Sequence, residues 1–134
     1  MNNNDTSKKN LIVSLLSAIS SMQSKNIEIG KAMNDMILAQ QNNNALELYR
    51  NALIFVWEFY GYGTHNDFKT SEDNSISYMM FELDACHNLK ELIDTLQRNS
   101  PFKINEEYAE ITSLLVSIFQ EVLERMDEKK ENAS

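Results

Sequence analysis

Glycine and proline are scarce in this chain, and their scarcity limits the folds open to it. The sequence has three glycines and one proline in 134 residues. Folds rich in β-strands need these residues at tight turns, where the backbone takes a positive φ or a fixed corner. An all-α fold is therefore predicted before any periodicity is considered. The chain has the length of one ordinary domain, residues 1–134, and can build a core without metal or disulfide support.

Apolar residues recur at steps of three and four in five segments of the sequence. This spacing places them along one side of an α-helix. Each apolar stripe must be buried, and short connections make neighbouring helices run in opposite directions. We therefore predict an all-α antiparallel bundle of about five helices, with residues 1–5 and 130–134 fraying at its ends. The predicted helices span about residues 8–22, 27–41, 44–60, 75–98 and 105–128.

Three of these helices carry more specific predictions. The run from Gln40 to Asn44 suits a helix boundary, with Asn44 as the N-cap of the next helix. Residues 51–63, NALIFVWEFYGYG, have the composition of a strand, but their length and spacing favour a helix. The fourth helix is expected to run unbroken to the Asn-Ser-Pro sequence at residues 99–101. Its predicted buried stripe is Ile76, Met79, Leu83, Cys86, Leu89, Ile93 and Leu96.

The stretch KKNLIVSLLSAISSM, residues 8–22, fits two interpretations. Lys8 and Lys9, followed by apolar residues and a small-x-small sequence, are features of a secretory signal peptide. Ser14 and Ser17 interrupt the apolar centre, however, and the remaining apolar residues have helical spacing. We therefore predict that the stretch is the first helix of a cytoplasmic domain. Its apolar stripe is Ile12, Leu15, Leu16, Ile19 and Met22.

Cysteine usage and hydropathy agree with a cytoplasmic location. A single cysteine, Cys86, cannot form an internal disulfide, and such a chain suits a reducing cytosol. No apolar run approaches the length of about 18 to 20 residues that crosses a bilayer. The many asparagines are typical of an AT-rich genome and indicate a bacterial or phage source. Cys86 lies on a predicted core stripe, where it acts as a small apolar residue and not as a nucleophile.

Acidic residues are concentrated in the second half of the chain. The formal net charge is −8 at pH 7. Residues 1–66 hold five acidic and five basic side chains, whereas residues 67–134 hold fifteen acidic and seven basic ones. Such a surface repels phosphate backbones and anionic lipids, so direct binding of nucleic acid or of a membrane is not expected. Two interpretations remain: a solvated face that maintains solubility, or a surface that attracts a basic protein.

Motifs for catalysis, cofactors and metals lack their essential residues. Asp84 and His87 have the carboxylate-x-x-histidine spacing of di-iron bundles, but His65, the other histidine, lacks the carboxylate. Glycine-based motifs for phosphate binding or a nucleophile are absent. Small helical ribonucleases of the HEPN type carry an arginine followed by a histidine, and neither Arg50 nor Arg98 has that histidine. We predict no catalytic residue, no cofactor and no metal site.

The segment 61–75, GYGTHNDFKTSEDNS, holds two of the three glycines and is predicted to form a long loop. His65 and Asp67 could form an acid–base pair there, although no nucleophile accompanies them. Large aromatic residues near acidic ones also make good interface anchors, because they bury much area at a modest entropic cost. We favour this second role. The residues predicted to bind a partner are Tyr60, Tyr62, His65, Asp67, Phe68, Glu72, Asp73, Glu82 and Asp84.

In size, acidity and lack of catalytic motifs, the chain resembles the small helical immunity proteins of bacteria. Those proteins neutralise contact-dependent inhibition toxins or nuclease bacteriocins, and the resemblance is one of general type across the whole chain. It implies a cytoplasmic protein, not an enzyme, that occludes a basic toxin domain such as a nuclease. The alternative is a helical secretion or flagellar export chaperone that holds an amphipathic client segment in a groove. A phage-encoded nuclease inhibitor and an enzyme with unrecognised chemistry also remain open.

Overall fold

A computed structural model describes residues 3–69, 75–103 and 106–133. All regular structure in these ranges is helical, which confirms the predicted all-α bundle. Two 3-10 helices, η1 (His65–Phe68) and η2 (Glu106–Tyr108), accompany the α-helices. The five α-helices of the described ranges are α1 (Asn3–Ala32), α2 (Met36–Phe59), α3 (Ser75–Leu83), α4 (Ala85–Asn99) and α5 (Ala109–Ala133). Within those ranges, no helix is both long enough and apolar enough to cross a membrane.

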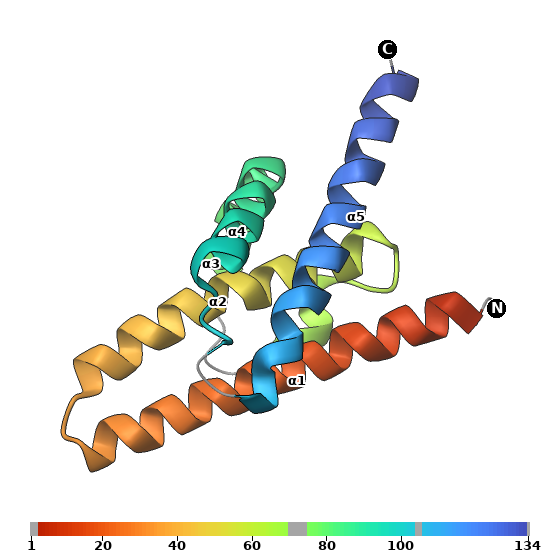
Figure 1. Ribbon diagram of the computed structural model, residues 1–134. Helices are drawn as coiled ribbons and strands as arrows, with labels where there is room; N and C mark the ends of the chain where they lie inside the picture. The colour runs from red at the N-terminus through yellow and green to blue at the C-terminus, as the bar shows by residue number, and fades with distance from the viewer. Residues whose placement is uncertain (1–2, 70–74, 104–105, 134) are drawn as a thin grey trace.

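The helices form two groups that cross each other. α1 and α2 make a long antiparallel hairpin, and its closed end extends beyond the other helices (Figure 1). α4 and α5 pack together and stand across the hairpin, with the short α3 beside α4 (Figure 1). The chain termini lie at the open end of the hairpin and at the far end of α5. This arrangement leaves the hairpin tip and the outer side of α3 away from the centre of the bundle.

The first turn of the chain lies at residues 33–35, inside the predicted helix 27–41, and α1 runs without a break through residues 23–26, where the first two predicted helices were separated. Asn34 has a positive φ of 53°, and the Asp35 carboxylate caps α2 by accepting a hydrogen bond from Leu38 N at 3.1 Å. The predicted boundary at residues 40–44 is therefore wrong, because α2 runs straight through it. Asn43 instead joins the two helices: its Nδ2 donates to Gln23 O at 3.1 Å. The polar run thus forms contacts between helices and not a turn.

The core combines stripes from all the long helices. The apolar stripe of residues 8–22 is mostly in it, since Ile12, Leu15, Leu16 and Ile19 are all buried. α5 contributes the predicted positions Ile111, Leu115, Ile118 and Val122. The largest fully buried side chains are Phe102, Phe119, Ile12, Ile19, Leu53, Ile54, Leu89, Leu96, Leu115, Val56 and Val122. The first predicted helix is therefore an integral part of the folded domain.

The predicted fourth helix is broken in two. Asp84 leaves helical geometry, with φ −136° and ψ 48°, and separates α3 from α4. The break resets the helical phase, so Tyr78 and Phe81 face the core in place of the predicted stripe. Ile76 and Leu83, predicted to be buried, are 67% and 86% exposed. After the break, Cys86 is only half-buried and Ala85 is buried in its place, whereas Leu89, Ile93 and Leu96 are buried as expected.

Candidate functional site

Residues 61–69 of the predicted loop pack around an aromatic cluster at the single tryptophan. The Trp57 ring meets Phe68 edge-on at 5.0 Å between centroids and Tyr62 at 5.5 Å. Trp57 Nε1 donates to Asp67 Oδ2 at 2.9 Å, and the same oxygen accepts from Thr64 N at 3.1 Å. Asp67 therefore caps η1 and anchors the indole. Its carboxylate is occupied by these contacts and does not face His65.

His65 has a different acidic neighbour. Its Nδ1 lies 3.6 Å from Glu58 Oε2, and its ring stacks on Tyr78 at 5.1 Å. The Tyr78 hydroxyl donates to Glu58 and, at 3.4 Å, to Glu82. Burial, followed by the hydrogen bond to Glu58, raises the pKa of Tyr78, so this phenol remains a donor. The suggested His65–Asp67 acid–base pair is therefore not formed, because each residue has other partners.

Tyr60 lies at a junction of α1, α2 and α5. Lys8 Nζ is 4.1 Å from the centre of its ring, and the Arg125 guanidinium is 5.4 Å away. Lys8 also pairs with Glu121 at 2.7 Å. Burial, with a further contribution from Glu121, raises the pKa of Tyr60 to about 12. Tyr60 thus has a structural role within the bundle, and its ring is covered by cations of the chain itself.

The other titratable residues that the structure describes do not gather at one place. In the described ranges, no group of three His, Cys, Asp or Glu side chains is placed to hold a metal ion. His87 Nε2 pairs with Glu91 Oε1 at 3.1 Å on the surface of α4, while Asp84 occupies the start of that helix. Cys86 is half-buried. These groups do not converge on a common point.

The exposed side of α3 carries the most unusual surface in the described ranges. Its residues Ile76, Met79, Met80 and Leu83 follow the i, i+3, i+4, i+7 spacing of one helical face, and all four are exposed. Glu82 and Asp84, both predicted partner-binding residues, are exposed beside this stripe. Glu72 and Asp73 lie outside the described residues. We call these four apolar residues with Glu82 and Asp84 the α3 surface.

Within the described ranges, some acidic residues pair with cations of the chain itself and others do not. Glu121 pairs with Lys8 and Arg125, and Asp94 pairs with Arg98 at 2.6 Å. Asp84 has no ion pair within the described ranges. In the part of the chain that the structure describes, the charge of Asp84 is therefore not compensated by an ion pair, and the same holds for Glu124 and Asp127 on α5. An exposed apolar stripe of this kind marks an interaction surface more often than a solvated face.

The sequence held a signal for this surface. Residues 76–83, ISYMMFEL, are apolar on both sides of a short helix, which exceeds what one buried stripe requires. Tyr78 and Phe81 fill the inner side, so the aliphatic residues of the outer side have no place in the core. Sequence reasoning missed this, because it assigned the outer stripe to the core of one continuous helix.

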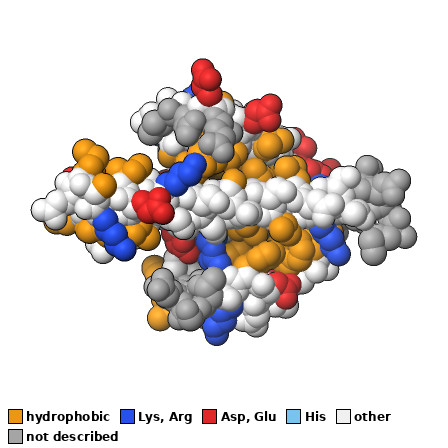
Figure 2. Space-filling model, turned by 90° about the horizontal axis from the view of Figure 1, so that it is seen from below, with side chains coloured by type: hydrophobic (Ala, Val, Ile, Leu, Met, Phe, Trp, Pro, Cys, Tyr) orange, Lys and Arg blue, Asp and Glu red, His pale blue; other side chains and the backbone are white. Residues whose placement is uncertain are grey.

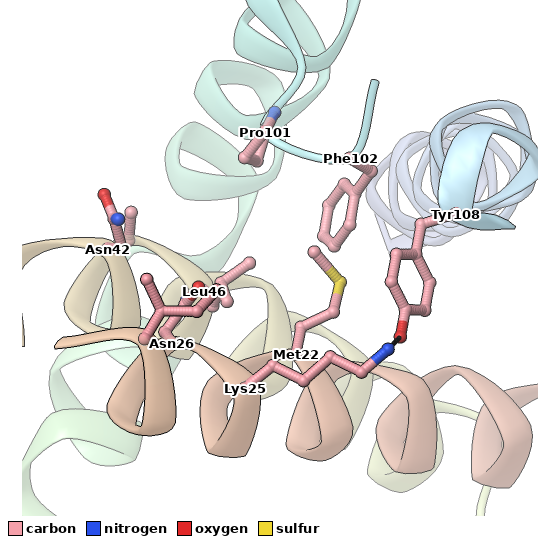
Figure 3. A pocket seen from close by; sticks show the side chains of 10 residues that line it. Met22, Lys25, Asn26, Asn42, Leu46, Pro101, Phe102 and Tyr108 are labelled. Carbon is pink, nitrogen blue, oxygen red and sulfur yellow. Dashed lines mark hydrogen bonds between the residues drawn. The ribbon is translucent and has the colours of Figure 1, made fainter. Parts of the chain in front are cut away.

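A second apolar region follows the seam between α1 and α2. A pocket of about 270 Å³ lies between the hairpin and the residues Pro101, Phe102 and Tyr108, and a smaller one of about 60 Å³ continues it toward the tip. The two share Asn26, Ile29 and Asn42 and form what we call the hairpin groove. Figure 3 shows Met22 and Phe102 facing each other across the larger pocket.

A polar contact closes one end of the hairpin groove, and exposed apolar residues surround its other end. Lys25 Nζ donates to Tyr108 Oη at 2.9 Å and closes one side of the larger pocket (Figure 3). At the other end, hydrophobic side chains gather over the tip of the hairpin, on the left of Figure 2. The exposed apolar residues there are Ile27, Ile29, Met33, Met36, Ile37 and Leu38.

No protein-family model, curated protein or solved structure matches this chain.

Proposed function

We propose that this protein is an immunity-type inhibitor that binds and occludes a basic toxin domain, such as a nuclease, without chemistry of its own. The observation that carries the proposal is the α3 surface, where an exposed aliphatic stripe adjoins the exposed carboxylates of Glu82 and Asp84. Apolar surface supplies affinity when a partner covers it, at about 25 cal/mol per Å². Carboxylates around it select a partner of positive charge.

The charge of the whole chain adds to this selection. A net charge of −8 speeds the encounter with a cationic protein and slows the encounter with an anionic one. Nucleases are basic at their active sites because their substrate is anionic. A bound acidic protein excludes that substrate both by volume and by like charge. Inhibition then requires only a surface, which agrees with the scattered positions of His65, Cys86 and His87.

Growth rescue tests the proposed function. A panel of basic nuclease toxin domains is expressed in bacteria with and without this protein, and survival is scored. We expect rescue from at least one domain, and loss of rescue when Glu82→Lys and Asp84→Lys are combined. The matched control is Glu124→Lys with Asp127→Lys, on α5. Rescue from no domain, or equal loss with the control pair, would show the proposal to be wrong.

Binding in solution gives a second readout. Association with the toxin domain from which the bacteria are rescued is expected to slow by an order of magnitude or more between about 50 and 500 mM salt, because screening weakens the electrostatic attraction between the two proteins. Dissociation is expected to change less, because burial of the apolar stripe holds the complex. An association rate that does not respond to salt would contradict a role for the carboxylates.

The hairpin groove favours a second candidate function, that of a chaperone for an amphipathic client helix. Its apolar lining includes Met22 and Leu46, and methionine adapts to varied side chains. A chaperone of this type retains a hydrophobic peptide at high salt, whereas the inhibitor function depends on charge. Retention of a client peptide in 1 M salt, abolished by Met22→Glu and unaffected by Glu82→Lys, would favour the chaperone.

A further inference from the structure

Resting on the proposed function, we infer that the α3 surface receives a cationic amphipathic helix of the partner, with one apolar side chain inserted between α3 and α4. The insertion point is a hollow of about 440 Å³ between α2, α3 and α4, which we call the α3–α4 groove. Leu48 of α2 and Met80 of α3 form its apolar sides, and the buried residues Phe81 and Leu92 line its inner part.

The groove is continuous with the exposed stripe. Met80 belongs to both, and Leu48 is also exposed, so apolar surface extends from the outer side of α3 onto α2. Asn88 Nδ2 donates to Phe81 O at 2.9 Å and fixes the wall between α3 and α4. Nine residues of α3 extend over about 13 Å at the helical rise of 1.5 Å per residue. A partner helix of two to three turns therefore covers the stripe.

The charges around the groove specify the sign of the partner. Asp84, Asn88 and Glu91 follow one another at steps of four and three, so they share one side of α4. Lys90 lies on the opposite side of that helix. The residues that line the groove include Glu91 and no basic residue. The ion-pair partner of Glu91 is His87, which carries charge only when it is protonated.

A second copy of this chain fits the groove poorly. Two copies related by a twofold axis present the same surface to each other, so Glu82, Asp84 and Glu91 would meet their own counterparts. Like charges placed together across an interface cost several kcal/mol. A helix with an apolar edge and flanking lysines or arginines covers the same stripe and pairs with these carboxylates. The charge pattern therefore selects the cationic helix over self-association.

Three labelled peptides of 18 residues test the inference by fluorescence anisotropy with the full chain. One is an amphipathic helix of leucine and lysine, one is its leucine and glutamate counterpart, and one is a scrambled leucine and lysine peptide without an apolar edge. We expect the first to bind at least about tenfold more tightly than the others, a difference of about 1.4 kcal/mol. Equal binding of the scrambled peptide would reduce the effect to bulk charge and overturn the inference.

Variants then locate the binding site. Met80→Asp and Glu91→Lys are expected to weaken binding of the cationic helix by about tenfold each. Ile37→Asp at the hairpin tip and Glu124→Lys on α5 are matched changes at other exposed positions, and are expected to change it by less than about twofold. Equal loss with the controls would contradict the assignment to the groove. Sedimentation that finds a dimer, converted to a monomer by Met80→Asp, would assign the surface to a second copy.

The two proposals can fail separately. If a toxin domain is neutralised and Met80→Asp neutralises it equally well, the groove assignment is wrong while the inhibitor function stands. If the cationic helix binds and Met80→Asp abolishes that binding, but no toxin domain is neutralised, the groove assignment stands and the inhibitor function is wrong. Circular dichroism of each variant establishes that it is folded, which is expected because Met80 and Glu91 are exposed.

Discussion

Lys8 Nζ lies 2.7 Å from Glu121 Oε1 and joins α1 to α5 across 113 positions of the sequence. The same ammonium group lies over the Tyr60 ring, so one side chain connects three helices. The hydrogen bond from Lys8 is the main reason that the pKa of Glu121 lies below its ordinary value. The acidic second half of the chain is thus partly neutralised by the first half at this point, whereas Asp84 at the end of α3 has no ion pair within the described ranges.

Glu121→Gln is expected to lower the free energy of unfolding at pH 7 by about 0.5 to 1 kcal/mol, since the pair is partly exposed and screened. Because the folded-state pKa is below the ordinary one, this stability is present above the ordinary value and is lost as pH falls toward the lowered pKa. Urea unfolding of both proteins at pH 7 and pH 3 measures the difference. An equal difference at both pH values would contradict the linkage.

Asp67→Ala is expected to destabilise the fold by about 1 to 2 kcal/mol, because Trp57 Nε1 and the capped Thr64 N both lose their acceptor. The single tryptophan reports the change directly, and its emission is expected to shift to longer wavelength as the loop opens. Asn66→Ala, one position away and exposed, is the control. If the Asp67→Ala protein were as stable as the original but bound its partner more weakly, Asp67 would belong to the partner-binding surface.

Alkaline titration is expected to separate the tyrosines. Burial raises the pKa of Tyr49 to about 12 from the ordinary value of 10.0, and Tyr60 is raised to about 12 as well. A raised folded-state pKa stabilises the fold at pH values below the ordinary pKa, and this stability is lost as the pH rises through the raised pKa. Absorbance at 295 nm should therefore show late phenols that ionise well above pH 10. Tyr49→Phe should remove a late one, and a single transition near pH 10 would contradict the burial.

Leu83→Gln and Phe81→Ala are expected to differ sharply in stability. Leu83 is 86% exposed, so its replacement should change the free energy of unfolding by less than about 0.5 kcal/mol. Phe81 is buried, and its truncation should cost about 3 to 5 kcal/mol. Thermal unfolding of the two variants measures both. A large loss with Leu83→Gln would mean that the outer side of α3 packs within the chain.

The sequence was sufficient for the all-α class and for most of the core, since both follow from local periodicity, but it placed several helix boundaries wrongly. The stripe of α5 and that of residues 12–19 lie where spacing places them. The turn at residues 33–35 was not predictable in this way, because several asparagine and aspartate residues could cap a helix here, and the choice of Asp35 goes with the close approach of Gly30 to Ala39. An added Cβ at Gly30 would lie 2.7 Å from Ala39 Cβ.

The candidate site was predictable only in part. Aromatic and acidic residues did mark the loop, but their partners depend on which helices cross, and no local pattern places Glu58 beside His65. The break at Asp84 accompanies the burial of Tyr78 and Phe81 in the core, and no local pattern marks its position. Once that break is given, helical spacing alone places Ile76, Met79, Met80 and Leu83 on the outer side.

The closed end of the hairpin extends past α4 and α5, so each of its two helices there has only the other for support (Figure 1). Few buried apolar contacts hold that end, and opening it does not require the rest of the molecule to unfold. Amide protons near Met33 and Ile37 should therefore exchange with solvent long before those near Leu53 or Leu115. The molecule then has a stable centre and one hairpin end that opens locally while the rest stays folded.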